Sequence, residues 1–118
     1  MSTVQAPVSD MLVTVKSREV QRGMLAEMSS DRIGAARHYL AAAHLEVVLA
    51  KDYEQVGQAD MAIRSRISAA SCFWRAGRIE SARTLFDAVI GDSPDQTGAI
   101  QQLITELERD YPALDRAS

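Results

Sequence analysis

The stretch CFWRAGRIESARTLFDAVIGDSP, residues 72–94, decides the fold because it holds two helical segments and the turn between them. Gly77 stands where the helical periodicity breaks, as a glycine that ends a helix does. Apolar residues then recur at helical spacing: Ile79, Ala82, Leu85, Phe86 and Val89. Pro94 follows as a stop. The stretch therefore predicts a helical hairpin.

The same periodicity predicts five helices, at about 10–28, 31 to the mid-50s, 58–75, 79–90 and 94–110. Ser9 is the expected N-cap of the first helix, and Gly57 breaks the chain before the third. Gly91 is expected to end the fourth, and Ser93 with Pro94 to begin the fifth. Short connections make neighbouring helices antiparallel, so we expect an all-α fold. It forms a single domain over 9–112, with a flexible leader at 1–8 and a flexible tail at 113–118.

Composition excludes several classes of partner. The net charge of −3 gives no general attraction to nucleic acid or to an anionic membrane, and no stretch approaches the length of a membrane span. The single cysteine, Cys72, forms no internal disulfide, and the first ten residues lack the pattern of a signal peptide. These features predict a soluble cytoplasmic protein without nucleic-acid or membrane partners.

An internal repeat is visible in the packing positions. The pattern Ile79, Ala82, Leu85, Phe86 is matched by Ile33, Ala36, Tyr39, Leu40 at a constant offset of 46 residues. In each copy a small residue follows three positions after isoleucine, which lets two helix backbones approach closely. Two helical hairpins with similar packing are therefore expected, and the fifth helix is left over.

Residues 63–96 resemble a tetratricopeptide repeat. The resemblance rests on Ala69 and Ala70 as the close-packing pair of the first helix and on Phe73 as its aromatic position, with the turn at Gly77. Ala82, Phe86 and Pro94 match the second helix and its terminator. Residues 17–50 resemble a weaker copy, with Met24 where a small residue is usual. The family's repeat is about 34 residues long, whereas the offset here is 46. The resemblance implies two hairpins capped by the C-terminal helix.

Catalytic and metal-binding patterns are absent from the sequence. His38 and His44 are six residues apart and face different sides of a helix, so they do not form a chelating pair. Cys72 lies among small and aromatic residues, as a buried thiol does. No phosphate-binding loop, metalloprotease or nucleophile-elbow motif occurs. We therefore expect no enzymatic activity, no cofactor and no metal.

The candidate site lies on the third helix. The resemblance implies that the first helix of each hairpin lines a concave face, and one side of residues 58–75 carries Arg64, Ile67, Ser71, Trp74 and Arg75. Tryptophan and arginine are typical of contact patches between proteins. An acidic or amphipathic partner segment fits this composition, whereas the family's usual asparagine-containing carboxylate clamp is excluded because the chain has no asparagine. The alternative is that Trp74 packs under the neighbouring loop and the arginines are solvated.

Three functions follow as hypotheses. The leading one is a non-catalytic adaptor or scaffold of bacterial type that binds a partner peptide or helix on its concave face. The second is a structural homodimer that buries an uncovered face of the first helix. The third is a helical-bundle enzyme or small-molecule sensor with a pocket between the second and third helices.

Overall fold

The computed structural model describes residues 5–112, and within them the chain forms five α-helices, one short 3₁₀ turn and no strand. The α-helices are α1 (Gln5–Met28), α2 (Arg32–Gln55), α3 (Ala59–Arg75), α4 (Ile79–Asp92) and α5 (Thr97–Asp110), with the 3₁₀ turn at Pro94–Gln96. The predicted all-α class is confirmed for this part of the chain. Residues 1–4 of the predicted leader and the predicted tail at 113–118 lie outside the described residues.

Helix boundaries differ from the prediction at three places. The first helix begins at Gln5 rather than after Ser9, because Pro7 falls in its first turn, where an amide proton would have no partner. The fourth helix continues through Gly91 to Asp92. The chain from Pro94 first forms a 3₁₀ turn, and α5 begins only at Thr97, whose hydroxyl donates to the Pro94 carbonyl at 2.7 Å.

Three helix connections share one turn geometry. Ser30, Gly57 and Gly77 each have a positive φ, at 60°, 78° and 82°. In every case the following amide donates 2.8 Å to a carbonyl five residues earlier, as in Asp31 to Ala26, Gln58 to Tyr53 and Arg78 to Phe73. This pattern is the Schellman motif, which ends one helix and reverses the chain. The turn at residues 29–31 therefore ends a helix and reverses the chain in the same way as the two glycine turns.

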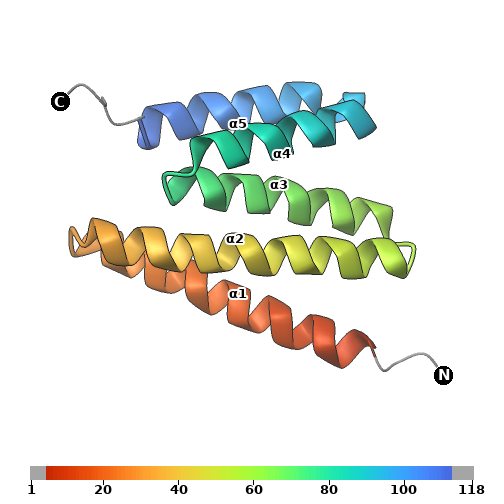
Figure 1. Ribbon diagram of the computed structural model, residues 1–118, viewed down its shortest axis with the longest axis horizontal. Helices are drawn as coiled ribbons and strands as arrows, with labels where there is room; N and C mark the ends of the chain where they lie inside the picture. Colours follow the sequence, from red (N-terminus) through yellow and green to blue (C-terminus); the bar gives the residue numbers. More distant parts are fainter. Residues whose placement is uncertain (1–4, 113–118) are drawn as a thin grey trace.

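The helices follow one another across the molecule from α1 at one edge to α4 and α5 at the other (Figure 1). Helix α2 packs against α1 and α3, while α5 returns to contact both α3 and α4. The Cα atoms span 56 Å along the longest axis and 18 Å along the shortest. Because helix axes pack 8–10 Å apart, the thin dimension has room for two layers of helices.

The core changes character along the stack. Large side chains fill the space between α3, α4 and α5: Trp74, Phe86, Val89, Ile100 and Leu107, around Ala70 and Ala82. Small ones meet between α2 and α3, where Ala42, Ala43 and Cys72 pack with Val20 of α1 and with Phe73. Small residues bring α2 and α3 close together, while large ones fix the position of the C-terminal helices.

Candidate functional site

Helix α3 lies at the centre of the stack and presents a different set of side chains on each side. Phe73 and Cys72 pack against alanines of α2, and Trp74 and Ile67 pack toward α4 and α5. The remaining face has the spacing of four, seven and eleven residues that one side of a helix requires. It carries Arg64, Ser68, Ser71 and Arg75.

The structure places Trp74 in the core and not on an exposed contact face. Its side chain is 2% exposed, and its indole nitrogen donates to the Tyr111 carbonyl at 3.3 Å. The guanidinium of Arg83, which also pairs with Glu108, lies 4.9 Å from the centre of the ring. Ile67 is half-buried against the same core. The sequence pattern placed both residues beside the arginines because they are only 60–100° away around the helix.

Arg75 is half-buried between two aromatic rings. Its guanidinium carbon lies 5.6 Å from the Tyr39 ring centre and 5.7 Å from that of Tyr111, and its buried Nε has no hydrogen-bond partner within residues 5–112. The Tyr39 hydroxyl donates to Glu27 at 2.6 Å. Burial and this hydrogen bond raise the pKa of Tyr39, and burial is also the main cause of the raised pKa of Tyr111. Both rings therefore remain neutral beside the cation.

A groove runs between α1 and α3 with α2 as its floor. Its lining comes from all three helices: Val13, Lys16, Glu46, Leu49, Tyr53, Met61, Arg64, Ser65 and Ser68. Glu46 is only 3% exposed, and the Lys16 ammonium lies 3.4 Å from its carboxylate. Lys16 is thus neutralised within the groove. Arg64 is exposed and forms no ion pair among the described residues, so it is the cation open to a ligand here.

Helix α1 lines the groove with Val13 and Lys16, and further apolar residues lie on the same side of this helix as Val13. Val13, Val20 and Met24 fall on one side of the helix, with Ser17 between them, and Val20 packs against the small core beneath. Met24 is 50% exposed, and Met28 at the end of the helix is 82% exposed. The groove therefore carries Val13 and the paired Lys16 on its α1 side, and Met61, Arg64, Ser65 and Ser68 on its α3 side. Sequence reasoning found Arg64 but missed Ser68 and the two α1 residues.

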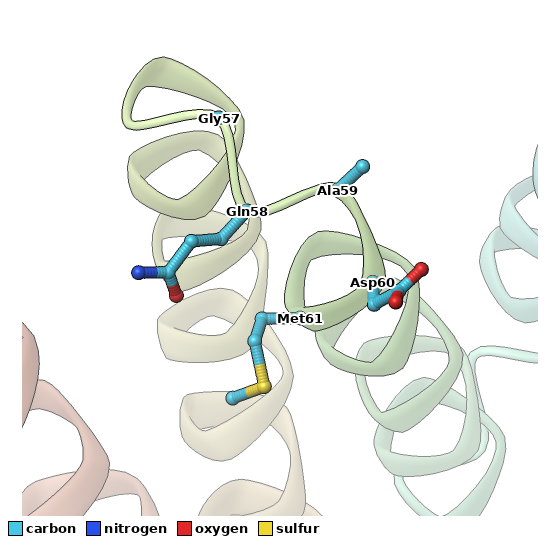
Figure 2. Close-up of a pocket in the computed structure, with 5 residues that line it drawn as sticks. All are labelled: Gly57, Gln58, Ala59, Asp60 and Met61. Carbon is cyan, nitrogen blue, oxygen red and sulfur yellow. The ribbon is translucent and has the colours of Figure 1, made fainter.

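A second hollow lies outside the α2–α3 turn and is lined by five consecutive residues, Gly57 to Met61. Figure 2 shows that the side chains of Gln58 and Met61 point to one side while Ala59 and Asp60 point away from them. No element other than this turn contributes to the hollow. It collects no group of chemical interest and is not a candidate site.

Nucleophilic and metal-binding groups are dispersed over the described residues. Burial raises the pKa of the Cys72 thiol to about 11, so the thiol is protonated at neutral pH. His38 is half-buried and hydrogen-bonded to Glu19 at 2.8 Å, while the His44 ring lies perpendicular to that of Phe73, with 5.4 Å between the ring centres. Residues 5–112 contain no group of three metal-ligating side chains.

Comparisons with known proteins assign the chain to no family. No family model, no curated protein and no solved structure matches the chain. Among the described helices, none combines the length and the apolar character that crossing a bilayer requires.

Proposed function

We propose that this chain is a non-catalytic protein-interaction module, a short tetratricopeptide-like stack that works as an adaptor or scaffold. In this proposal α1–α2 and α3–α4 are two antiparallel hairpins, and α5 caps the second. The outward side of α5 supports this role because its exposed residues are small or polar: Ala99, Gln101, Gln102, Thr105, Glu106, Glu108 and Arg109. A polar terminal helix is what the end of a helical stack needs.

The observation that carries the proposal is the two-sided groove between α1 and α3. An amphipathic segment has an apolar side for Val13, Leu49 and Met61 and a charged side for Arg64. Because Arg64 forms no ion pair with any carboxylate in residues 5–112, an acidic partner residue supplies the missing charge. The partner is therefore a protein segment that carries acidic and aliphatic side chains.

A second candidate, the structural homodimer, is favoured by one observation. Large exposed apolar residues lie only at positions 11–61 within the described chain. Met11, Val15 and Leu25 lie on α1 away from the groove wall, where another copy could cover them. Against it, Arg18 lies between Met11 and Leu25 on the same side, so two such faces would bring like charges together.

Photo-crosslinking in cells of the source organism tests the proposal. Benzoylphenylalanine at position 68 lies in the groove, whereas the same residue at position 37 lies on the exposed side of α2. We expect an adduct from position 68 that Arg64→Glu abolishes and that Arg78→Glu, at the exposed α3–α4 turn, leaves intact. Equal adducts from both positions, or adducts insensitive to Arg64→Glu, would overturn the proposal. An adduct of twice the chain mass identifies the homodimer instead.

A further inference from the structure

The end of α5 brings a residue from the far end of the chain onto α3. Tyr111 directly follows α5, and its amide donates to the Leu107 carbonyl at 2.7 Å. Its carbonyl accepts the indole proton of Trp74, and its ring lies 5.7 Å from the Arg75 guanidinium. Tyr111 therefore covers the Arg75 end of the α3 face, while the Arg64 end stays open.

The contacts that Tyr111 makes outside α5 are ones that a tyrosine of another chain can also make. They are its backbone carbonyl on Trp74, its ring beside Arg75, and its hydroxyl, which hydrogen-bonds with Tyr39 and Glu27. On the receiving side, the Tyr39 ring forms the opposite wall of the arginine. With Tyr111 in place, no atom of the described part of the chain accepts a hydrogen bond from the arginine Nε. A ligand that brought an additional acceptor to this nitrogen would satisfy a buried donor that Tyr111 leaves unpaired.

We propose that Tyr39, Trp74 and Arg75 form a subsite for an aromatic residue, occupied in the free protein by the chain's own Tyr111. The inference rests on the proposed function and specifies the chemistry of the partner. The partner residue displaces Tyr111, stacks on the Arg75 guanidinium and presents its backbone carbonyl to the Trp74 indole. Tyr111 thus acts as an internal competitor at the Arg75 end of the α3 face.

Helix geometry fixes the spacing that the partner needs. Arg64 and Arg75 are eleven residues apart on α3, a rise of about 16 Å at 1.5 Å per residue. A partner in extended conformation covers this distance in about five residues, whereas a helical one needs about eleven. The partner motif is accordingly an aromatic residue and an acidic residue at one of these two separations.

The full-length chain allows a direct test because Trp74 is its only tryptophan, so one indole N–H resonance reports on the subsite. The probe is an acetylated peptide of residues 109–113, Arg-Asp-Tyr-Pro-Ala, and its control has alanine in place of the tyrosine. The protein is used as wild type, as Tyr111→Ala and as Tyr111→Phe. The last variant keeps the aromatic ring and serves as the matched control.

We expect the tyrosine peptide to shift the indole resonance as it binds. Its affinity for Tyr111→Ala should be at least about tenfold higher than its affinity for wild type or Tyr111→Phe. In the latter two proteins the tethered ring competes at a millimolar effective concentration. The alanine peptide should leave all three spectra unchanged. An unshifted resonance in Tyr111→Ala, or an equal response to both peptides, would overturn the subsite.

Hydrogen exchange of the wild-type protein provides a second measurement that does not depend on a variant. If Tyr111 opens locally, the Trp74 indole proton exchanges faster than the core amide of Phe86, which needs global unfolding. Equal protection of the two protons would show that Tyr111 is a fixed part of the core. If the position-68 adduct forms but the peptide titration shows no difference between the Tyr111 variants, this inference alone fails. The adaptor proposal then still stands.

Discussion

The two ends of this helical stack are built from different chemistry. At the C-terminal end α3, α4 and α5 enclose large apolar side chains, and the exposed side of α5 is polar. At the N-terminal end three polar pairs join α1 to α2: Lys16 with Glu46, Glu19 with His38 and Glu27 with Tyr39. Val20 packs inward, but other apolar side chains of α1 are exposed, including Met24 and Met28.

This contrast indicates that the two ends of the helical stack contribute differently to the protein. A helix with a large apolar core and a polar outer face is complete by itself. Helix α1 pairs its polar side chains with α2 and leaves methionine and valine side chains exposed. It therefore has apolar surface that a partner can cover. The C-terminal end therefore contains the large apolar core that stabilises the fold, and in the proposed function the N-terminal end supplies the binding surface.

The largest effect that tests this contrast is expected from Phe86→Ala. Phe86 is fully buried in the C-terminal core, so its truncation leaves a cavity and should cost about 3–5 kcal/mol of unfolding free energy. Val48→Ala, at a half-exposed position on α2, should change it by less than about 0.5 kcal/mol. Urea denaturation followed by circular dichroism measures both. Equal costs for the two variants would refute the assignment of stability to the C-terminal end.

A smaller loss is expected from Lys16→Met in the polar α1–α2 interface. This change leaves the buried Glu46 carboxylate without its ion partner, which should cost about 1–3 kcal/mol. The double variant Lys16→Met/Glu46→Leu should recover most of the loss because neither charge remains buried. Arg109→Met removes a solvent-exposed pair with Asp110 and should have no measurable effect. A double variant less stable than Lys16→Met would contradict this account.

The smallest effect is expected from Gly23→Ala at the α1–α2 contact. A β-carbon at position 23 would lie 3.0 Å from the Tyr39 ring and would push the two helices apart. Overpacking should outweigh the gain in helix propensity and leave a net loss of about 1 kcal/mol. Gly98→Ala in α5 meets no atom within 4 Å and should cause no loss. Thermal unfolding compares the two, and a stabilised Gly23→Ala would show that the α1–α2 contact is loose.

The sequence by itself determined the all-α class, the number of helices and the turns at Gly57 and Gly77. These features are local: helical periodicity and a glycine with positive φ depend on neighbouring residues. It also identified Arg64, Ser71 and Arg75 as one side of α3, because that spacing is a property of a single helix. The sequence placed the start of α1 and the end of α4 wrongly, because Pro7 and Gly91 are each compatible with a helix near its terminus.

Only the tertiary structure decided what each side of α3 meets. Trp74 and Arg75 are adjacent in sequence, yet one is in the core and the other lies between a tyrosine of α2 and the tyrosine that follows α5. Val13 of α1 and Arg64 of α3 line one groove only because α2 packs against both helices. Periodicity gives the angle of a side chain around its own helix, but the partner at that angle depends on how distant helices pack.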